Sequence, residues 1–132
     1  MTAQGDEACI FCQIGRKEKP GAIVAEFEKC YVKKDDFPVS PGHLIVIPYD
    51  HTENWFTASA EIRQDILQAL DAMKDELDQE FHPDGYNIGM NCGAAAGQSV
   101  MHLHVHLIPR YQGDTPNPRG GVRGVIPSKQ SY

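Results

Sequence analysis

The stretch GQSVMHLHVHLIPRY, residues 97–111, places three of the chain's six histidines at every second position, with apolar residues between and after them. This alternation is typical of a β-strand with one buried face. Successive side chains of a strand point to opposite faces, and equivalent positions lie roughly 6.5–7 Å apart. We therefore expect the imidazoles of His102, His104 and His106 in one continuous row, on the face opposite Leu103 and Val105.

A solvent-exposed strand face is the alternative interpretation of this row. Such a face usually carries Lys, Glu and Thr, and none of these occurs between His102 and Ile108. Histidine is favoured where a group acts as a nucleophile, an acid or base, or a metal ligand near neutral pH. The pattern therefore favours a reactive or metal-binding site.

Length and charge limit the classes of protein that the sequence can encode. A chain of 132 residues suits a single domain, here a core of about residues 9–114 followed by a tail rich in Gly and Pro, residues 115–132. The net charge of −6 argues against a nucleic-acid surface, but not against a small phosphorylated ligand. We find no apolar run of about 20 residues and no signal-peptide pattern, and so expect a cytoplasmic protein without a membrane partner.

The periodicity along the chain predicts an α+β domain. Residues 59–81 carry apolar side chains at spacings of three and four, which indicates an amphipathic helix that Thr57 or Ser59 can cap. Its predicted core positions are Ile62, Ile66, Leu70, Met73 and Leu77. The predicted strands are residues 22–27, 30–35, 43–51 and 86–91 and the histidine strand. This order predicts a mainly antiparallel sheet with one long helix on a face.

The segment CIFCQI, residues 9–14, is interpreted as a short knuckle with the Cys-x-x-Cys spacing of a zinc half-site. A closed site needs two more ligands, for which His51 and His102 are candidates. A redox pair and plain buried thiols remain alternatives, although redox motifs usually begin a helix in a βαβ context that this sequence lacks. Cys30 and Cys92 have no paired spacing and are expected to be small buried or pocket-wall residues.

The same region offers the parts of a nucleophilic site for phosphorus. Neutral imidazole attacks activated phosphorus, and the labile phospho-histidine can be resolved by a second acceptor such as water. Charge on the phosphate oxygens needs hydrogen-bond donors. The candidates are the Ser99 hydroxyl, the Asn91 amide and the backbone N–H groups of residues 97–99. His106 can also donate if it is protonated.

These residues resemble the histidine triad (HIT) nucleotide-binding family. Residues 102–108 match its signature, in which three histidines alternate with apolar residues, and residues 40–51 resemble its second conserved block. CIFC is similar to the start of the zinc-bearing bacterial-type members, and Asp35 with Pro38 to a ribose-contacting turn. The resemblance covers residues 9 to about 114.

The resemblance implies a five-stranded antiparallel sheet that continues across a homodimer. It also implies that His104 attacks an α-phosphate to form a nucleotidyl-histidine, while His106 and Ser99 hold phosphate oxygens. Further nucleotide-binding positions are expected at Asn91, Gly97, Gln98, His43 and Asp35. A structural zinc ion is expected on Cys9, Cys12, His51 and His102.

The expected function is hydrolysis or nucleotidyl transfer at the α-phosphate of a purine nucleotide derivative. LIPRYQGD, residues 107–114, resembles the branch that cleaves dinucleoside polyphosphates such as diadenosine tetraphosphate. GQSV and Asn91 look more like the phosphoramidase branch. We also expect Arg119, Arg123 or Lys129 to supply charge to a polyphosphate, unless the tail is simply solvated. A non-catalytic nucleotide sensor and a zinc-stabilised interaction protein are the alternatives.

Overall fold

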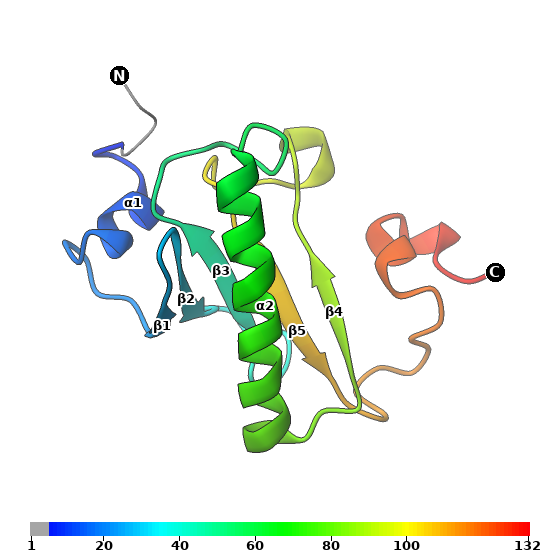
Figure 1. Ribbon diagram of the computed structural model, residues 1–132. Coiled ribbons are helices and arrows are strands. Elements are labelled where there is room, and N and C mark those ends of the chain that lie inside the picture. Colours follow the sequence, from blue (N-terminus) through cyan, green and yellow to red (C-terminus); the bar gives the residue numbers. More distant parts are fainter. Residues whose placement is uncertain (1–5) are drawn as a thin grey trace.

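The computed structural model describes residues 6–132 as one antiparallel sheet crossed on one face by a long helix (Figure 1). The strand order is β1-β2-β3-β5-β4. This confirms the predicted α+β fold. The elements are α1 (Ile10–Gly15), β1 (Ile23–Glu26), β2 (Cys30–Lys34), β3 (Leu44–Pro48), α2 (Ala60–Phe81), β4 (Gly85–Gly89), η1 (Ala94–Ala96), β5 (Val105–Arg110), η2 (Gly121–Val125) and η3 (Pro127–Lys129).

The long helix α2 is held by its apolar stripe and by its caps. All five predicted core positions of this helix are buried. Ser59 is the N-cap, and its hydroxyl accepts the N–H of Ile62 at 3.2 Å. His82 ends the helix in a left-handed conformation. None of the helices described in residues 6–132 is apolar enough over sufficient length to cross a membrane.

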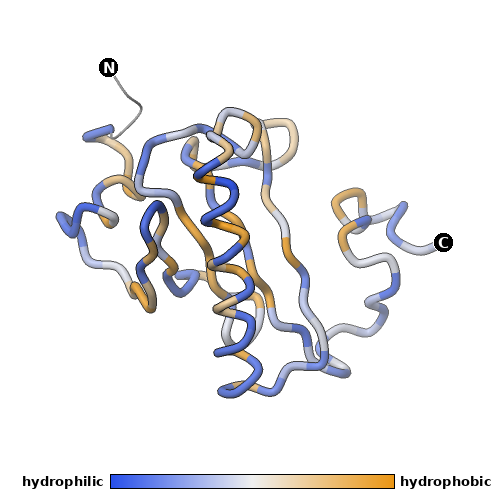
Figure 2. Tube along the Cα trace, in the orientation of Figure 1, coloured by the Kyte–Doolittle hydropathy of each residue, from blue (hydrophilic) through white to orange (hydrophobic). Residues whose placement is uncertain are grey.

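The sheet is covered on both faces, but unequally. The main core lies between α2 and strand residues such as Val32, Val46 and Val105, each 0% exposed. Figure 2 shows apolar colour along the central strands and polar colour on the outer side of α2. A smaller cluster around Tyr31 and Ile47 lies on the other face, where Phe11 of α1 packs against it. The rest of this second face is therefore available for a site.

The cysteine segment differs from the expected irregular knuckle, because it forms the short helix α1 with Cys9 as its N-cap. The backbone N–H of Gln13 donates to the Cys9 carbonyl at 3.0 Å. Residues three apart lie on one side of a helical turn, so this turn brings Cys9 and Cys12 side by side. The element order thus begins with a helix that the periodicity did not predict.

The histidine strand is shorter than expected, because β5 begins only at Val105. The ladder between β3 and β5 ends at the pair of Val46 and Val105, although β3 itself continues to Pro48. The Leu103 N–H bonds instead to the Thr52 carbonyl at 2.8 Å. Burial still alternates, and Leu103, Val105 and Leu107 all lie in the core. The predicted faces are correct, whereas the predicted extent of the strand is wrong.

We predict that Ile66→Ala lowers the free energy of unfolding by about 2–5 kcal/mol, because Ile66 is fully buried between α2 and the sheet. Leu67→Ala is the matched control, since Leu67 is 52% exposed on the same helix and should cost less than about 0.5 kcal/mol. Urea unfolding measures both. Equal losses in the two variants would contradict this assignment of the core.

Candidate functional site

The candidate site lies on the sheet face opposite α2, around His104 and His106. The two rings meet edge to face with centroids 5.3 Å apart. Phe11 of α1 contacts His104 at a ring-centroid distance of 5.1 Å and His102 at 5.8 Å. The expected continuous row is therefore divided: His104 and His106 form one group, and His102 turns into a cluster with the cysteines.

One hydrogen bond fixes the proton on His104. Its Nδ1 lies 2.9 Å from the backbone carbonyl oxygen of His102. A carbonyl oxygen only accepts, so Nδ1 carries the proton and Nε2 keeps its lone pair. The ring is partly buried, and its Nδ1 is bound to the backbone carbonyl of His102. It presents an unprotonated nitrogen, which is the state that a nucleophile needs.

A chain of hydrogen bonds sets the opposite tautomer on His106. The backbone N–H of Val39 donates to His43 Nδ1 at 3.1 Å, so the His43 proton must lie on Nε2. That Nε2 lies 2.9 Å from His106 Nδ1, which must then accept. His106 therefore carries its own proton on Nε2. The ring is a donor in its neutral form, so the protonated state expected from the sequence is not required.

Burial keeps His43 and His106, the two histidines of this series of hydrogen bonds, neutral near pH 7. It lowers the pKa of His106 to about 4, an effect that the neighbouring His104 and His43 increase and that Asp35 opposes. Burial also lowers the pKa of His43. The Asp35 Oδ2 lies 3.4 Å from His43 Nε2 and 3.6 Å from His106 Nδ1. The Asp35 carboxylate thus lies beside both rings, but His43 Nε2 remains the donor and His106 Nδ1 the acceptor.

Asp35, His43 and His106 are close enough to be considered as metal ligands. The tautomer argues against that role. Since Val39 occupies the lone pair on His43 Nδ1, the nitrogen facing His106 carries a proton and cannot ligate an ion. We interpret this group as a hydrogen-bond relay.

Lys33 is a feature of this face that the sequence analysis missed. It pairs with Ile45 across β2 and β3, and Ile45 pairs with His106 across β3 and β5. Its side chain is only 2% exposed, and Nζ donates to the Lys34 carbonyl at 2.8 Å and to Asp36 at 3.2 Å. The ammonium thus fixes the turn that carries Asp35. A lysine at an inward position of a predicted strand was the available signal.

The loop before the histidines uses two of the backbone donors that were expected to bind phosphate. The N–H groups of Gly97 and Gln98 bond to the carbonyls of Ala94 and Gly93 at 3.0 and 3.1 Å. The buried Gln98 side chain donates to the Glu53 carbonyl at 2.6 Å and accepts the Gly93 N–H. Gln98 therefore holds the loop in shape.

Ser99 and Asn91 are two polar residues of this loop that face solvent. Both side chains are exposed, and across residues 6–132 no hydrogen bond engages the Ser99 hydroxyl, its N–H or the Asn91 amide. The Asn91 amide lies beside the Gly97 backbone. Asn91 lines the same groove as His106, and the binding of phosphate by Asn91 and Ser99 stays a prediction.

The second constellation is a four-residue cluster of Cys9, Cys12, His51 and His102. The His102 Nδ1 lies 3.3 Å from the Cys9 sulfur, 3.5 Å from the Cys12 sulfur and 3.2 Å from His51 Nδ1, while Cys12 and His51 are 3.3 Å apart. Tetrahedral zinc with bonds of about 2.0–2.3 Å needs ligands roughly 3.3–3.8 Å apart. The donor set and its spacing fit that ion.

The protonation states at this cluster also suit a cation. His102 Nε2 donates to the Pro48 carbonyl at 2.8 Å, which leaves the Nδ1 lone pair for the cluster. Burial lowers the pKa of His102 to about 4, so its ring is neutral. Burial also raises the pKa of the Cys12 thiol to about 11, so forming a thiolate there needs a cation.

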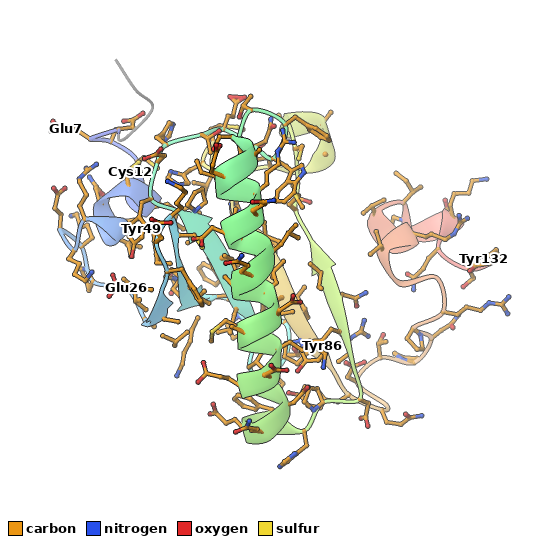
Figure 3. The ribbon with its side chains drawn as sticks, viewed as in Figure 1. Glu7, Cys12, Glu26, Tyr49, Tyr86 and Tyr132 are labelled. Carbon is orange, nitrogen blue, oxygen red and sulfur yellow. The ribbon has the colours of Figure 1, made fainter. Side chains whose placement is uncertain are left out.

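The C-terminal tail forms the other wall of the site. A groove of about 390 Å³ lies beside His106 and Asn91, with Val122 and Val125 of the tail opposite β4. The guanidinium groups of Arg119 and Arg123 lie 5.1 and 4.8 Å from the Tyr132 ring centroid. Figure 3 shows Tyr132 beyond the β4 edge of the sheet and Cys12 near the opposite edge. The tail cations thus pack on the tail itself, and their proposed contact with polyphosphate stays a prediction.

The segment LIPRYQGD, residues 107–114, has a structural role in the turn after β5. Arg110 forms two hydrogen bonds of 2.8 Å with the Asp114 carboxylate. A third N–H donates to Asn87 of β4 at 2.6 Å. This pairing lowers the pKa of Asp114 to about 2. The motif therefore stabilises the turn from which the tail starts.

Comparison with known proteins identifies the family. The family model described as HIT domain matches residues 16–113. The chain belongs to the histidine triad (HIT) family. It is 40% identical over 105 residues to Protein hit of Bacillus subtilis, covering 80% of this chain and 72% of that protein. It is 32% identical over 113 residues to adenylylsulfatase HINT3 of Arabidopsis thaliana, covering 86% of this chain and 56% of the relative.

Solved structures of this nucleotide-binding family have the same fold. A Zn-bound histidine triad protein from Mycobacterium smegmatis aligns with a TM-score of 0.78 at 32% identity, over 83% of this chain and 80% of that one. A histidine triad nucleotide-binding protein from Candida albicans aligns with a TM-score of 0.72 at 33% identity, over 79% and 76% of the two chains.

We predict that the free energy of unfolding decreases as the pH is lowered, in part because His106 becomes protonated more readily in the unfolded chain. Its pKa is about 4 in the folded protein, against 6.5 for an unperturbed histidine, so the unfolded chain binds the proton first. The free energy of unfolding is therefore unaffected by this group above about pH 6.5 and decreases as the pH falls toward about 4. Urea unfolding at several pH values measures the slope. His106→Asn should reduce the slope without abolishing it, because the pKa of His102 is also lowered to about 4, and an unchanged slope would contradict the lowered pKa of His106.

Proposed function

We propose that the protein is a hydrolase or nucleotidyl transferase that cleaves at the α-phosphate of a purine nucleotide derivative through a nucleotidyl-His104 intermediate. One observation carries the proposal: the unprotonated His104 Nε2 stands next to His106, a neutral ring whose Nε2 carries a proton. A nucleophile and a donor of opposite tautomer are the pair that transfer at phosphorus requires. A module that only bound nucleotides would need no nucleophile.

In the proposed reaction, the His104 Nε2 lone pair forms a bond to the α-phosphorus while the bond to the leaving group breaks. The ring becomes positively charged, and the His102 carbonyl stabilises it through the Nδ1–H. His106 Nε2–H donates a hydrogen bond to a phosphate oxygen, and the leaving group departs with the electron pair of the broken bond and takes any proton it needs from solvent. Water or another acceptor then attacks phosphorus and loses its proton to solvent, while the bond from phosphorus to Nε2 breaks and His104 regains its lone pair.

The remaining contacts follow from the groups left free around this pair. Ser99 donates its hydroxyl and N–H to phosphate oxygens, and Asn91 donates its amide from beside the Gly97 backbone. Asp35 receives the ribose hydroxyls, as the family resemblance implies. Gly97 and Gln98 contribute by holding the loop, because their N–H groups are engaged within it.

The groove beside the tail supports a leaving group of moderate size, since it adjoins His106 from the β4 side. A dinucleoside polyphosphate and a nucleoside phosphoramidate both satisfy this arrangement. The Arabidopsis relative is named as an adenylylsulfatase, which also fits a hydrolase. The runner-up is a nucleotide sensor that uses the same pocket without turnover.

We also propose that Cys9, Cys12, His51 and His102 bind a structural zinc ion. When bound, zinc supplies the positive charge that keeps both thiols ionised and ties α1 to the sheet. The cluster geometry supports this, as does the Zn-bound relative from Mycobacterium smegmatis. His102 would serve twice, because its ring faces the cluster and its carbonyl orients His104.

A homodimer completes the proposal, as the family resemblance implies. The strand β4 lies at an edge of the sheet and carries Ile88, which is 51% exposed. An apolar edge strand of this kind can pair with a second copy.

We predict that His104→Asn abolishes AMP release from adenosine 5′-phosphoramidate and from a diadenosine polyphosphate, by at least roughly three orders of magnitude, because asparagine has no nucleophilic nitrogen. His82→Asn is the control, since His82 lies outside the site in a left-handed conformation that asparagine tolerates. Comparing the two substrates selects the branch. Tight AMP binding without turnover of either substrate would favour the sensor.

Metal removal should destabilise the fold without removing a catalytic group. We predict that a strong zinc chelator lowers the melting temperature by about 10 °C or more, and that Cys9→Ser has the same effect without chelator. Cys92→Ser is the matched control, because Cys92 lies outside the cluster. Thermal melting combined with metal analysis tests this. A preparation without zinc that keeps full stability would reject the assignment.

A further inference from the structure

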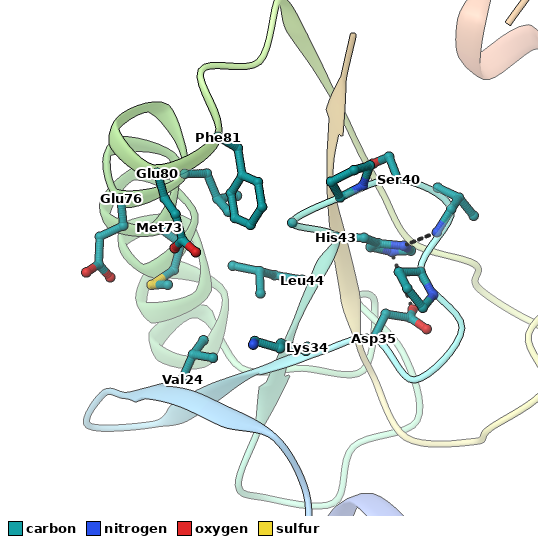
Figure 4. Close-up of a pocket in the computed structure, with 15 residues that line it drawn as sticks. Val24, Lys34, Asp35, Ser40, His43, Leu44, Met73, Glu76, Glu80 and Phe81 are labelled. Atoms are coloured by element: carbon teal, nitrogen blue, oxygen red, sulfur yellow. Dashed lines mark hydrogen bonds and ion pairs between the residues drawn. The ribbon is translucent and has the colours of Figure 1, made fainter. Parts of the chain in front are cut away.

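A second cavity, of about 630 Å³, lies between α2 and the sheet edge at β1, and Asp35 and His43 of the candidate site also line it (Figure 4). We call it the rear pocket. It lies between the C-terminal half of α2, strand β1 and the 38–43 loop. The residues that define it here are Val24, Leu44, Leu77, Phe81, Glu76 and Glu80.

The size and the floor of the rear pocket suit a small organic molecule. Ligand cavities in proteins typically occupy about 300–1,000 Å³ and are mostly apolar. Leu44, Met73 and Leu77 form the floor, and each is only 4% exposed. These side chains would contact an apolar ligand body.

The rim of the rear pocket has an unbalanced negative charge. Glu76 and Glu80 lie four residues apart on one side of α2, where like charges repel. Neither forms an ion pair with any residue in the part of the chain that the structure describes. The C-terminal end of a helix also carries partial negative charge, and the last turn of α2 has no basic residue. A cation at this rim would relieve all three effects.

We propose that the rear pocket binds a small amphiphilic amine, with its apolar body on Leu44 and Leu77 and its ammonium group between Glu76 and Glu80. Lys34 lies at the β2 end of the rim and excludes the ammonium from that end. The 38–43 loop forms the opposite wall, and this loop supplies the Val39 N–H that bonds to His43. A bound amine therefore rests directly behind His43.

The test uses three probes with one apolar body and different charge: 3-phenylpropylamine, 3-phenylpropanol and 3-phenylpropionate. Each is titrated into the full chain, without nucleotide, while amide and histidine-ring NMR signals are followed. We expect the amine to bind most tightly and to shift signals of Leu44, Leu77, Val39 and the His43 ring. Glu76→Gln with Glu80→Gln should weaken amine binding roughly 5-fold and leave the alcohol unchanged.

Asp71→Asn with Asp75→Asn is the matched control, because it removes the same charge from exposed positions of α2 that do not line the cavity. It should leave amine affinity nearly unchanged. Equal affinity for the three probes, signal shifts confined to another surface, or equal losses in the two double variants would overturn the proposal. No readout involves turnover, so the outcome is independent of the proposed nucleotide chemistry.

Discussion

The fully buried imidazole and backbone of His102 connect the parts of this molecule on which the candidate site depends. Its Nε2 donates to the end of β3 at Pro48, its Nδ1 faces the two cysteines and His51, and its carbonyl accepts from His104. One residue therefore joins the sheet, the α1 segment and the proposed nucleophile. A metal ion on this cluster would fix the backbone that sets the tautomer of His104.

The second organising constraint is burial. A protonated His106 would be a stronger donor, but its surroundings disfavour the charge and lower its pKa to about 4. The chain from Val39 through His43 resolves this conflict, because it places a proton on the outward nitrogen of an uncharged ring. Lys33 supports the same region by fixing the turn that carries Asp35. The site thus combines neutral histidines with charged groups, Asp35 and Lys33, that lie beside them.

The fold could be predicted where local periodicity is strong. The helix from Ala60 to Phe81 and the alternating burial after His102 follow from backbone geometry alone, so they required no knowledge of partners. The short helix α1 was missed because six residues carry too little periodicity to distinguish a turn of helix from a knuckle. The start of β5 was placed too early because the chain before Val105 leaves the β3 ladder, and the Leu103 N–H bonds instead to the Thr52 carbonyl, about 50 residues earlier in the sequence.

Residue types and their spacing were enough to predict a site built from a cysteine half-site, alternating histidines and a loop of small residues. The role of each group depends on the three-dimensional arrangement. Ring protons are positioned by carbonyl and N–H groups distant in the chain, as Pro48 does for His102. The Gln98 amide is engaged by its own loop, while the Ser99 donors face solvent. Hydrogen bonds form between groups that the fold brings close together in space, and residue type and spacing do not specify that proximity.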